Sequence, residues 1–135
     1  MQLSQFAKSY KSVAVNTSTP GQLTLMLFDG ALRFMGTAVL AFNEEDFVHR
    51  NELIHNNLIK TQNILAELQS SLNMQAEGPF PGLMYALYDF MLKQIREANL
   101  MKDMKPIRDV ERLLGEIRSA WAQMLEKSTS VNLAA

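Results

Sequence analysis

Hydrophobic residues recur every three or four positions along most of this chain, which is the period of an α-helix with one buried face. No long segment alternates apolar and polar residues as a half-buried strand would. Three stripes are clear: Phe47, Ile54, Leu58, Leu65, Leu68 and Leu72; Met84, Leu87, Met91, Ile95 and Ala98; and Val110, Leu114, Ile117, Trp121 and Met124. The pattern predicts an all-α fold.

Start and stop signals divide the chain into one short and four long segments. Thr19 and Gln22 have the spacing of a capping box, and Pro20 suits the first position of a helix. The expected helices cover residues 20–42, residues 47–72, the stretch from the Gly- and Pro-rich break at 78–82 to about 101, and residues 105–127. Short connections between such helices favour an antiparallel four-helix bundle. We therefore expect a bundle over residues 19–127 and a flexible C-terminal tail over residues 128–135.

The first long helix is apolar nearly all round. One side carries Leu23, Leu27, Ala31, Phe34 and Ala38, and nearly the opposite side carries Leu25, Phe28, Leu32, Met35 and Val39. A helix of this kind must be buried nearly all round, whereas a helix of a four-helix bundle usually keeps one face in water. The sequence therefore predicts an apolar face on this helix that packing within the bundle does not bury, and this surplus face could bind a partner.

Residues 1–18 are the expected cover for that face within the same chain. The apolar residues of this segment fall at helical spacing: Leu3, Phe6, Tyr10 and Val13. A helix this short is marginal by itself in water. We expect an additional short N-terminal helix or lid segment that a partner can displace.

The predicted partner-binding residues extend beyond the first helix. Phe28, Leu32 and Met35 are the strongest candidates, because a flexible thioether suits a surface that accommodates a variable helical partner. Tyr85 and Tyr88 lie toward the edge of the third buried stripe, where a tyrosine is either a structural boundary residue or a hydroxyl donor to a partner backbone. The full set is Tyr10, Leu25, Phe28, Leu32, Met35, Val39, Ile59, Tyr85, Tyr88 and Leu92.

Composition and charge exclude several classes of function. Lys and Arg number 13 against 14 Asp and Glu in 135 residues, so the strong cationic field of a general nucleic-acid binder is missing. The chain has no Cys, which excludes disulfides, thiol catalysis and thiolate zinc sites. No secretory signal is visible, and Asp29 and Arg33 interrupt the longest apolar stretch. We expect a cytosolic domain without membrane insertion.

The sequence gives little support for an enzymatic function. Glu52 and His55 match the Glu-x-x-His spacing of di-iron bundles, but such sites need two of these pairs and two further inward glutamates. An exposed polar turn is the favoured interpretation, so no catalytic, cofactor-binding or metal-binding residue is predicted. Two alternatives to a partner-binding bundle stay open: a degenerate di-metal carboxylate bundle, and self-association through the surplus face as a weak homodimer or a constitutive oligomer.

Several blocks of sequence, in their order and spacing, resemble a known family. They are Tyr10 with Val15, residues 17–23, residues 26–32, residues 60–68, Leu72-Asn73, residues 87–91, Ala98-Asn99, Asp103, Val110, Leu113-Leu114 and residues 117–121. Together they are similar to the FliS-type flagellar secretion chaperones, which bind flagellin. Phe28 departs from the pattern, because the family often has Tyr there.

The resemblance implies an antiparallel helical bundle whose N-terminal segment can cover a hydrophobic groove. It also implies a cytosolic chaperone that holds the disordered C-terminal segment of flagellin. Such a chaperone prevents premature polymerisation and presents flagellin to the export gate protein FlhA of the flagellar type III apparatus. No cofactor is implied.

Overall fold

The computed structural model describes residues 19–134, with side chains described up to Ser128. It consists of four α-helices: α2 (Pro20–Ala41), α3 (Phe47–Ser70), α4 (Phe80–Met101) and α5 (Met104–Ala134). The prediction of an all-α fold with four packed helices is confirmed. The expected lid over residues 1–18 lies outside the described residues.

Local signals set the starts of α2 and α3. Thr19 and Gln22 form the predicted capping box, in which the Gln22 N–H donates to Thr19 Oγ1 at 3.2 Å and the Thr19 N–H donates to Gln22 Oε1 at 3.0 Å. Asp46 caps α3 by accepting the Val48 N–H at 3.1 Å. The predicted end of the last helix near Lys127 is wrong, since α5 continues to Ala134. No Gly or Pro follows Lys127, so the polar serines and threonine there do not stop the helix.

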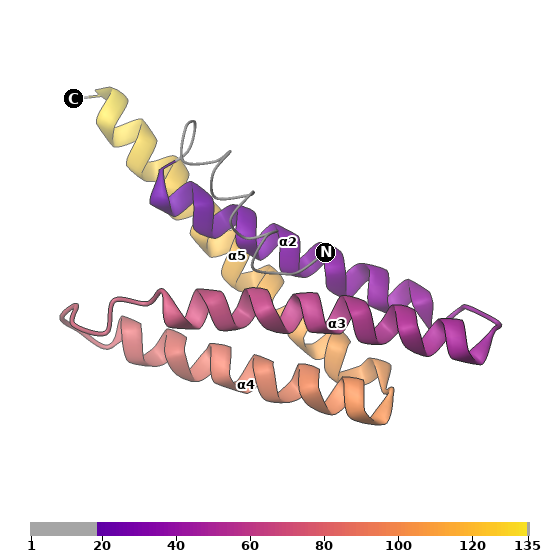
Figure 1. Ribbon diagram of the computed structural model, residues 1–135. Coiled ribbons are helices and arrows are strands. Elements are labelled where there is room, and N and C mark those ends of the chain that lie inside the picture. Colours follow the sequence, from indigo (N-terminus) through magenta and orange to yellow (C-terminus); the bar gives the residue numbers. More distant parts are fainter. Residues whose placement is uncertain (1–18, 135) are drawn as a thin grey trace.

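The four helices pack in a ring, in which α2 and α4 each contact both α3 and α5. Figure 1 shows α3 and α4 lying side by side, with α2 and α5 crossing them obliquely. The first turns of α2 and the last turns of α5 therefore extend beyond the α3–α4 pair as a two-helix arm. Because of this oblique crossing, the arm diverges from the α3–α4 pair, and the junction lies where the two pairs of helices separate.

The core explains much of the apolar character of α2. Phe28 and Met35 are fully buried and Val39 is 7% exposed, because α2 is packed against α3 on one side and α5 on another. The face of this helix that was expected to remain free is thus largely buried inside the bundle, and only Leu25 and Leu32 of that face are partly exposed.

Among the described residues, α2 is the one helix whose length and composition would suit a membrane span. Its environment is that of a core helix in a bundle. Asp29, in the middle of α2, pairs with Arg118 of α5, with Arg118 Nε 2.8 Å from Asp29 Oδ1. The apolar face of α2 is buried against protein, which accounts for its hydropathy without a membrane.

Candidate partner-binding site

An apolar cavity of about 280 Å³ lies where the arm leaves the α3–α4 pair. All four helices and the α3–α4 connection contribute to its wall, which consists of Thr24, Leu68, Ser71, Leu72, Asn73, Ala76, Phe80, Pro81, Met84, Tyr88 and Trp121. Pockets for drug-sized ligands range from about 300 to 1,000 Å³. This cavity therefore suits one or two large side chains of a partner better than a cofactor.

The α4 wall follows from helical spacing at the start of that helix. Phe80, Met84 and Tyr88 are four residues apart, so they form one ridge along α4. Met84 and Tyr88 are buried, whereas Phe80 is 51% exposed and stands at the cavity mouth. The ridge thus runs from the solvent into the interior of the bundle.

Trp121 of α5 is held in a defined orientation on the opposite wall. Its indole Nε1–H donates to the Gly21 carbonyl of α2 at 2.8 Å. Its ring meets Phe28 edge-on, with the ring centroids 6.1 Å apart. Gly21 leaves room for the Leu125 side chain of α5, because a Cβ at Gly21 would lie 2.6 Å from Leu125 Cδ2. Phe28 therefore supports the Trp121 ring from the buried side of the cavity wall and is not itself at the surface.

Tyr88 is a polar group of the cavity wall that can serve a partner. The side chain is 3% exposed, and burial raises the pKa of its hydroxyl to about 12. Among the described residues this hydroxyl has no hydrogen-bond partner, although it belongs to a residue of the cavity wall. It stays protonated at neutral pH, so it can donate to a carbonyl of an incoming peptide.

The α3–α4 connection and the start of α4, which contribute to the cavity wall, also carry exposed apolar side chains, which we call the rim; of these, Phe80 lines the cavity itself. Four large hydrophobic residues with roughly half of their surface exposed lie on the α3–α4 connection and the first turns of α4: Met74, Phe80, Leu83 and Tyr85. The Tyr85 carbonyl accepts a hydrogen bond from Gln69 Nε2 of α3 at 3.2 Å, which ties the rim to the neighbouring helix. An apolar cavity with an exposed apolar rim is typical of protein–protein interaction sites.

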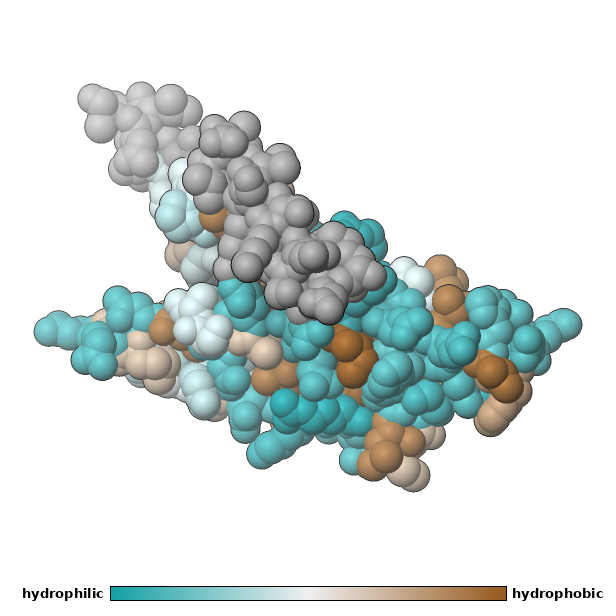
Figure 2. Space-filling model, viewed as in Figure 1, coloured by the Kyte–Doolittle hydropathy of each residue, from teal (hydrophilic) through white to brown (hydrophobic). Residues whose placement is uncertain are grey.

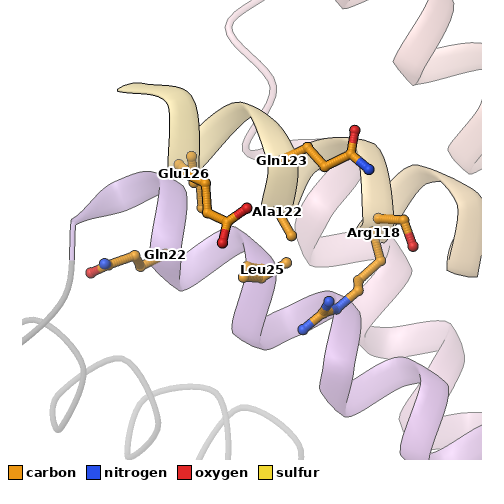
Figure 3. A pocket seen from close by; sticks show the side chains of 8 residues that line it. Gln22, Leu25, Arg118, Ala122, Gln123 and Glu126 are labelled. Carbon is orange, nitrogen blue, oxygen red and sulfur yellow. The ribbon is translucent and has the colours of Figure 1, made fainter. Parts of the chain in front are cut away.

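A second, shallower groove lies between α2 and α5 on the arm (Figure 3). Leu25, Ala122 and Leu125 give it a half-buried apolar floor. Gln22, Arg118, Ser119, Gln123 and Glu126 complete its lining. Arg118 is held across the arm by its ion pair, and its hydrogen bond to Asp29, followed by the Asp29 charge, raises the pKa of the guanidinium.

The predicted partner-binding residues are distributed over several environments. Leu25 lines the arm groove, Tyr88 lines the cavity, and Tyr85 is exposed on its rim. Leu32 and Ile59 are half-buried. The buried members are Phe28, Met35, Val39 and Leu92. The structure does not bring these residues together on one surface, and their partner-binding role stays a prediction.

The remaining predicted residues fall on the N-terminal segment. Tyr10, together with the other lid residues Leu3, Phe6 and Val13, lies outside the described residues.

Most of the cavity wall was not predicted as a binding site. Leu68, Leu72, Met84 and Trp121 fall on the buried stripes, and Phe80 falls in the Gly- and Pro-rich break. Periodicity assigns such residues to a core and gives no sign that several stripes meet at a gap. The available signal was the placement of an aromatic residue between two prolines directly at a helix start.

The pair Glu52 and His55 is exposed on α3. His55 Nδ1 lies 3.0 Å from Asn99 Nδ2 of α4, so the imidazole bridges two helices. Within the described part of the chain, no three His, Asp or Glu residues form a group that could hold a metal ion.

Similarity to known proteins extends over the whole of this site. A model of the family described as "Flagellar protein FliS" matches residues 2–128, a span that includes every residue of the cavity wall. The flagellar secretion chaperone FliS of Bacillus subtilis is 39% identical over 118 residues, 87% of this chain and 84% of that protein. The protein of the same name from Salmonella typhimurium is 35% identical over 127 residues, 90% of this chain and 91% of that protein. The one from Vibrio cholerae is 31% identical over 121 residues, covering 87% and 86% of the two chains. On these matches the chain belongs to the FliS family of flagellar secretion chaperones.

Proposed function

We propose that this chain is a cytosolic type III export chaperone for flagellin. It binds the C-terminal segment of flagellin, prevents premature polymerisation and delivers the subunit to the export gate protein FlhA. Membership in a family of flagellar secretion chaperones supports a flagellar export client. The structural observation that carries the proposal is the apolar cavity with its exposed rim of Met74, Phe80, Leu83 and Tyr85.

The cavity accepts a large apolar side chain of the client, and the rim packs against the apolar face of the client helix around it. Recognition of this kind is typical of an amphipathic helix in a groove. A disordered segment that folds as it docks spends about 2–5 kcal/mol of its interaction energy on ordering. The client segment therefore needs contacts beyond one cavity, and the arm groove around Leu25 and the half-buried residues Leu32 and Ile59 extend the proposed surface.

The buried candidates have a supporting role in this proposal. Phe28 orients Trp121 from beneath, and Met35, Val39 and Leu92 fill the core behind the helices that carry the site. The N-terminal segment with Leu3, Phe6, Tyr10 and Val13 is the proposed lid, which leaves the apolar surface when the client arrives.

The FliS family is non-enzymatic, in agreement with the prediction that the chain is not an enzyme. Release of the client therefore comes with transfer to the export gate and requires no hydrolysis by this chain.

The experiment is a titration of the chain with a peptide of the flagellin C-terminal segment from the same organism. Trp121 is the one tryptophan of the chain and lines the cavity, so its emission reports occupancy directly. We expect a blue shift on binding and an affinity loss of at least about tenfold for Leu83→Ser, since burial of one leucine is worth about 1.5–3 kcal/mol.

The matched control is Leu40→Ser, which changes a leucine of similar exposure, 70% against 58%, at the other end of the bundle. This variant should bind the peptide as the wild type does. Equal affinity of Leu83→Ser and the wild type would refute the proposed site of cavity and rim. Light scattering at several concentrations tests the alternative of a constitutive oligomer, for which the mass of the free chain would exceed that of a monomer throughout.

A further inference from the structure

A second apolar surface lies at the opposite end of the bundle, on the turn from α2 to α3. Leu40, Phe47 and Val48 are 70%, 66% and 67% exposed and form what we call the corner patch. In Figure 2, two hydrophobic areas with hydrophilic surface between them appear near the end of the molecule where Figure 1 places this turn. Phe47 and Leu68 mark opposite ends of α3, so the corner patch is about 30 Å from the cavity at 1.5 Å per residue.

The turn that carries the corner patch is held by local interactions. The Asn43 N–H donates to the Leu40 carbonyl at 3.1 Å, and the Asp46 side chain accepts the Val48 N–H at 3.1 Å. The Arg50 guanidinium carbon lies 5.2 Å from the ring centroid of Phe42 and 6.0 Å from that of Phe47. The apolar side chains are therefore presented on a preorganised turn, which lowers the entropy cost of binding.

Carboxylates surround the corner patch. Glu44, Glu45 and Asp46 connect the two helices, and Glu52 follows Val48 by one helical turn on α3. Within the described residues none of these four carboxylates forms an ion pair. The nearby cation, Arg50, is directed at the two aromatic rings. A partner that covers the patch thus meets an acidic border, which favours a partner with Lys or Arg of its own.

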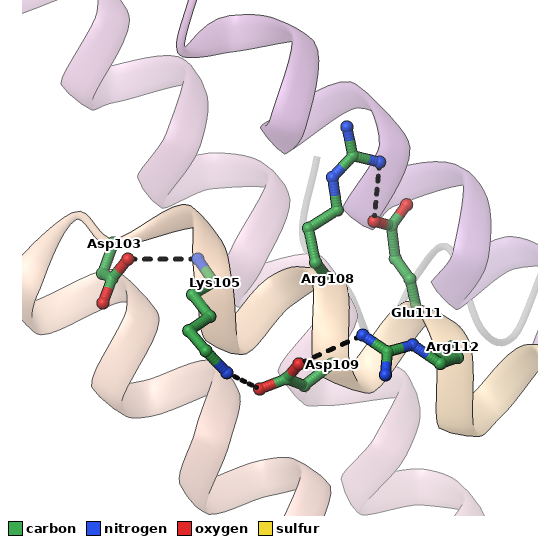
Figure 4. A network of polar contacts seen from close by, with 6 residues as sticks. All are labelled: Asp103, Lys105, Arg108, Asp109, Glu111 and Arg112. Carbon is green, nitrogen blue, oxygen red and sulfur yellow. Dashed lines mark hydrogen bonds and ion pairs between the residues drawn. The ribbon is translucent and has the colours of Figure 1, made fainter.

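A second copy of this chain is a less suitable partner for the corner patch, because its clustered cations are already paired. The most basic helical stretch of the described residues is the start of α5, where Lys105 and Arg112 pair with Asp109 and Arg108 pairs with Glu111 (Figure 4). These cations are already matched by carboxylates on their own helix. An anionic membrane surface is also disfavoured, since it would repel the acidic border.

We propose that the corner patch and its acidic border form a docking site for a basic amphipathic helix of another protein. The apolar face of that helix covers Leu40, Phe47 and Val48, and its flanking Lys or Arg residues approach Glu45, Asp46 and Glu52. The site is separate from the flagellin site proposed above and does not depend on it.

The test uses two synthetic probes with the full chain. One is an amphipathic helical peptide of Leu and Lys, and the other has Glu at every Lys position. Fluorescence anisotropy gives the affinities, and amide chemical shifts locate the site. We expect the Leu–Lys peptide to bind, to shift residues 40–52, and to weaken in about 1 M salt, where the screening length is about 3 Å. The Leu–Glu peptide should not bind.

Two variants at exposed positions separate the contributions. Leu40→Ser combined with Val48→Ser should lower the affinity for the Leu–Lys peptide at least about tenfold. Glu45→Lys combined with Glu52→Lys should do the same and should let the Leu–Glu peptide bind. Leu83→Ser, at the cavity end, is the matched control and should leave the affinity unchanged, and circular dichroism verifies that all variants are folded.

Three results would overturn this proposal. The first is unchanged binding of the Leu–Lys peptide to the Leu40→Ser, Val48→Ser double variant. The second is weakened binding to Leu83→Ser, which would place the peptide at the cavity. The third is a dimer in sedimentation that the double variant abolishes, since this would make the corner patch an interface between copies of this chain.

Discussion

Trp121 joins α5 to α2 through a hydrogen bond and an aromatic contact, and two substitutions separate these two contributions. Trp121→Phe removes the hydrogen bond to the Gly21 carbonyl and keeps an aromatic ring near Phe28. Because the carbonyl can still accept a helical N–H, the expected loss of unfolding free energy is about 1 kcal/mol, typical of one neutral hydrogen bond. This change should leave most of the cavity wall in place.

Trp121→Ala removes the ring as well. The edge-on contact with Phe28 contributes about 0.5–1.5 kcal/mol beyond area burial. Full truncation of a buried aromatic residue costs about 3–5 kcal/mol, and Trp121 is only half-buried. The expected total loss is therefore about 3 kcal/mol.

Urea unfolding followed by far-ultraviolet circular dichroism measures both losses, because these variants lack the single tryptophan and give no indole fluorescence. Gln123→Ala, on the exposed side of the same helix, is the control and should change the stability by less than about 0.5 kcal/mol. A loss below about 1 kcal/mol for Trp121→Ala would contradict the reasoning, since burial of the ring would then add nothing to the hydrogen bond that joins α5 to α2.

Two further predictions concern pH and backbone packing. Burial raises the pKa of Tyr88 from 10.0 to about 12, so the folded state favours the protonated hydroxyl. The corresponding contribution to the unfolding free energy is fully present below pH 10.0 and is lost as the pH rises toward about 12. Tyr88→Phe should flatten this decline of stability in urea titrations at several pH values. An unaltered decline in the variant would assign it to other groups. A Cβ added at Gly36 would meet no atom within 4 Å, whereas one added at Gly21 would lie 2.6 Å from Leu125 Cδ2. Gly36→Ala should therefore stabilise the chain by about 0.5–1 kcal/mol. Gly21→Ala should show no such gain in the same unfolding assay, and an equal gain at both positions would mean that the Leu125 side chain moves aside without cost.

Part of this architecture could be predicted from local sequence and part could not. The capping box of Thr19 and Gln22 and the spacing of the apolar stripes depend on a few neighbouring residues, so the start of α2 and the existence of four helices were predictable. The end of α5 was not, because a polar stretch without Gly or Pro neither continues nor stops a helix by itself.

The candidate site depends on contacts that periodicity does not contain. Phe28 and Met35 share one face of α2 with Leu32, yet the first two are fully buried and Leu32 is not. Phe28 and Met35 belong to the core cluster, whereas Leu32 packs against its edge, and the spacing along α2 does not distinguish these two places.

The sequence by itself determined which residues form helices and which face of each helix is apolar, since both follow from propensity, capping and the 3.6-residue period. Only the tertiary structure decided which apolar residues remain accessible. The Leu125 side chain of α5 occupies the space that a Cβ at Gly21 would need. Because α2 and α5 cross α3 and α4 obliquely, the gap beside Tyr88 and Trp121 arises from the angle between helices far apart in sequence.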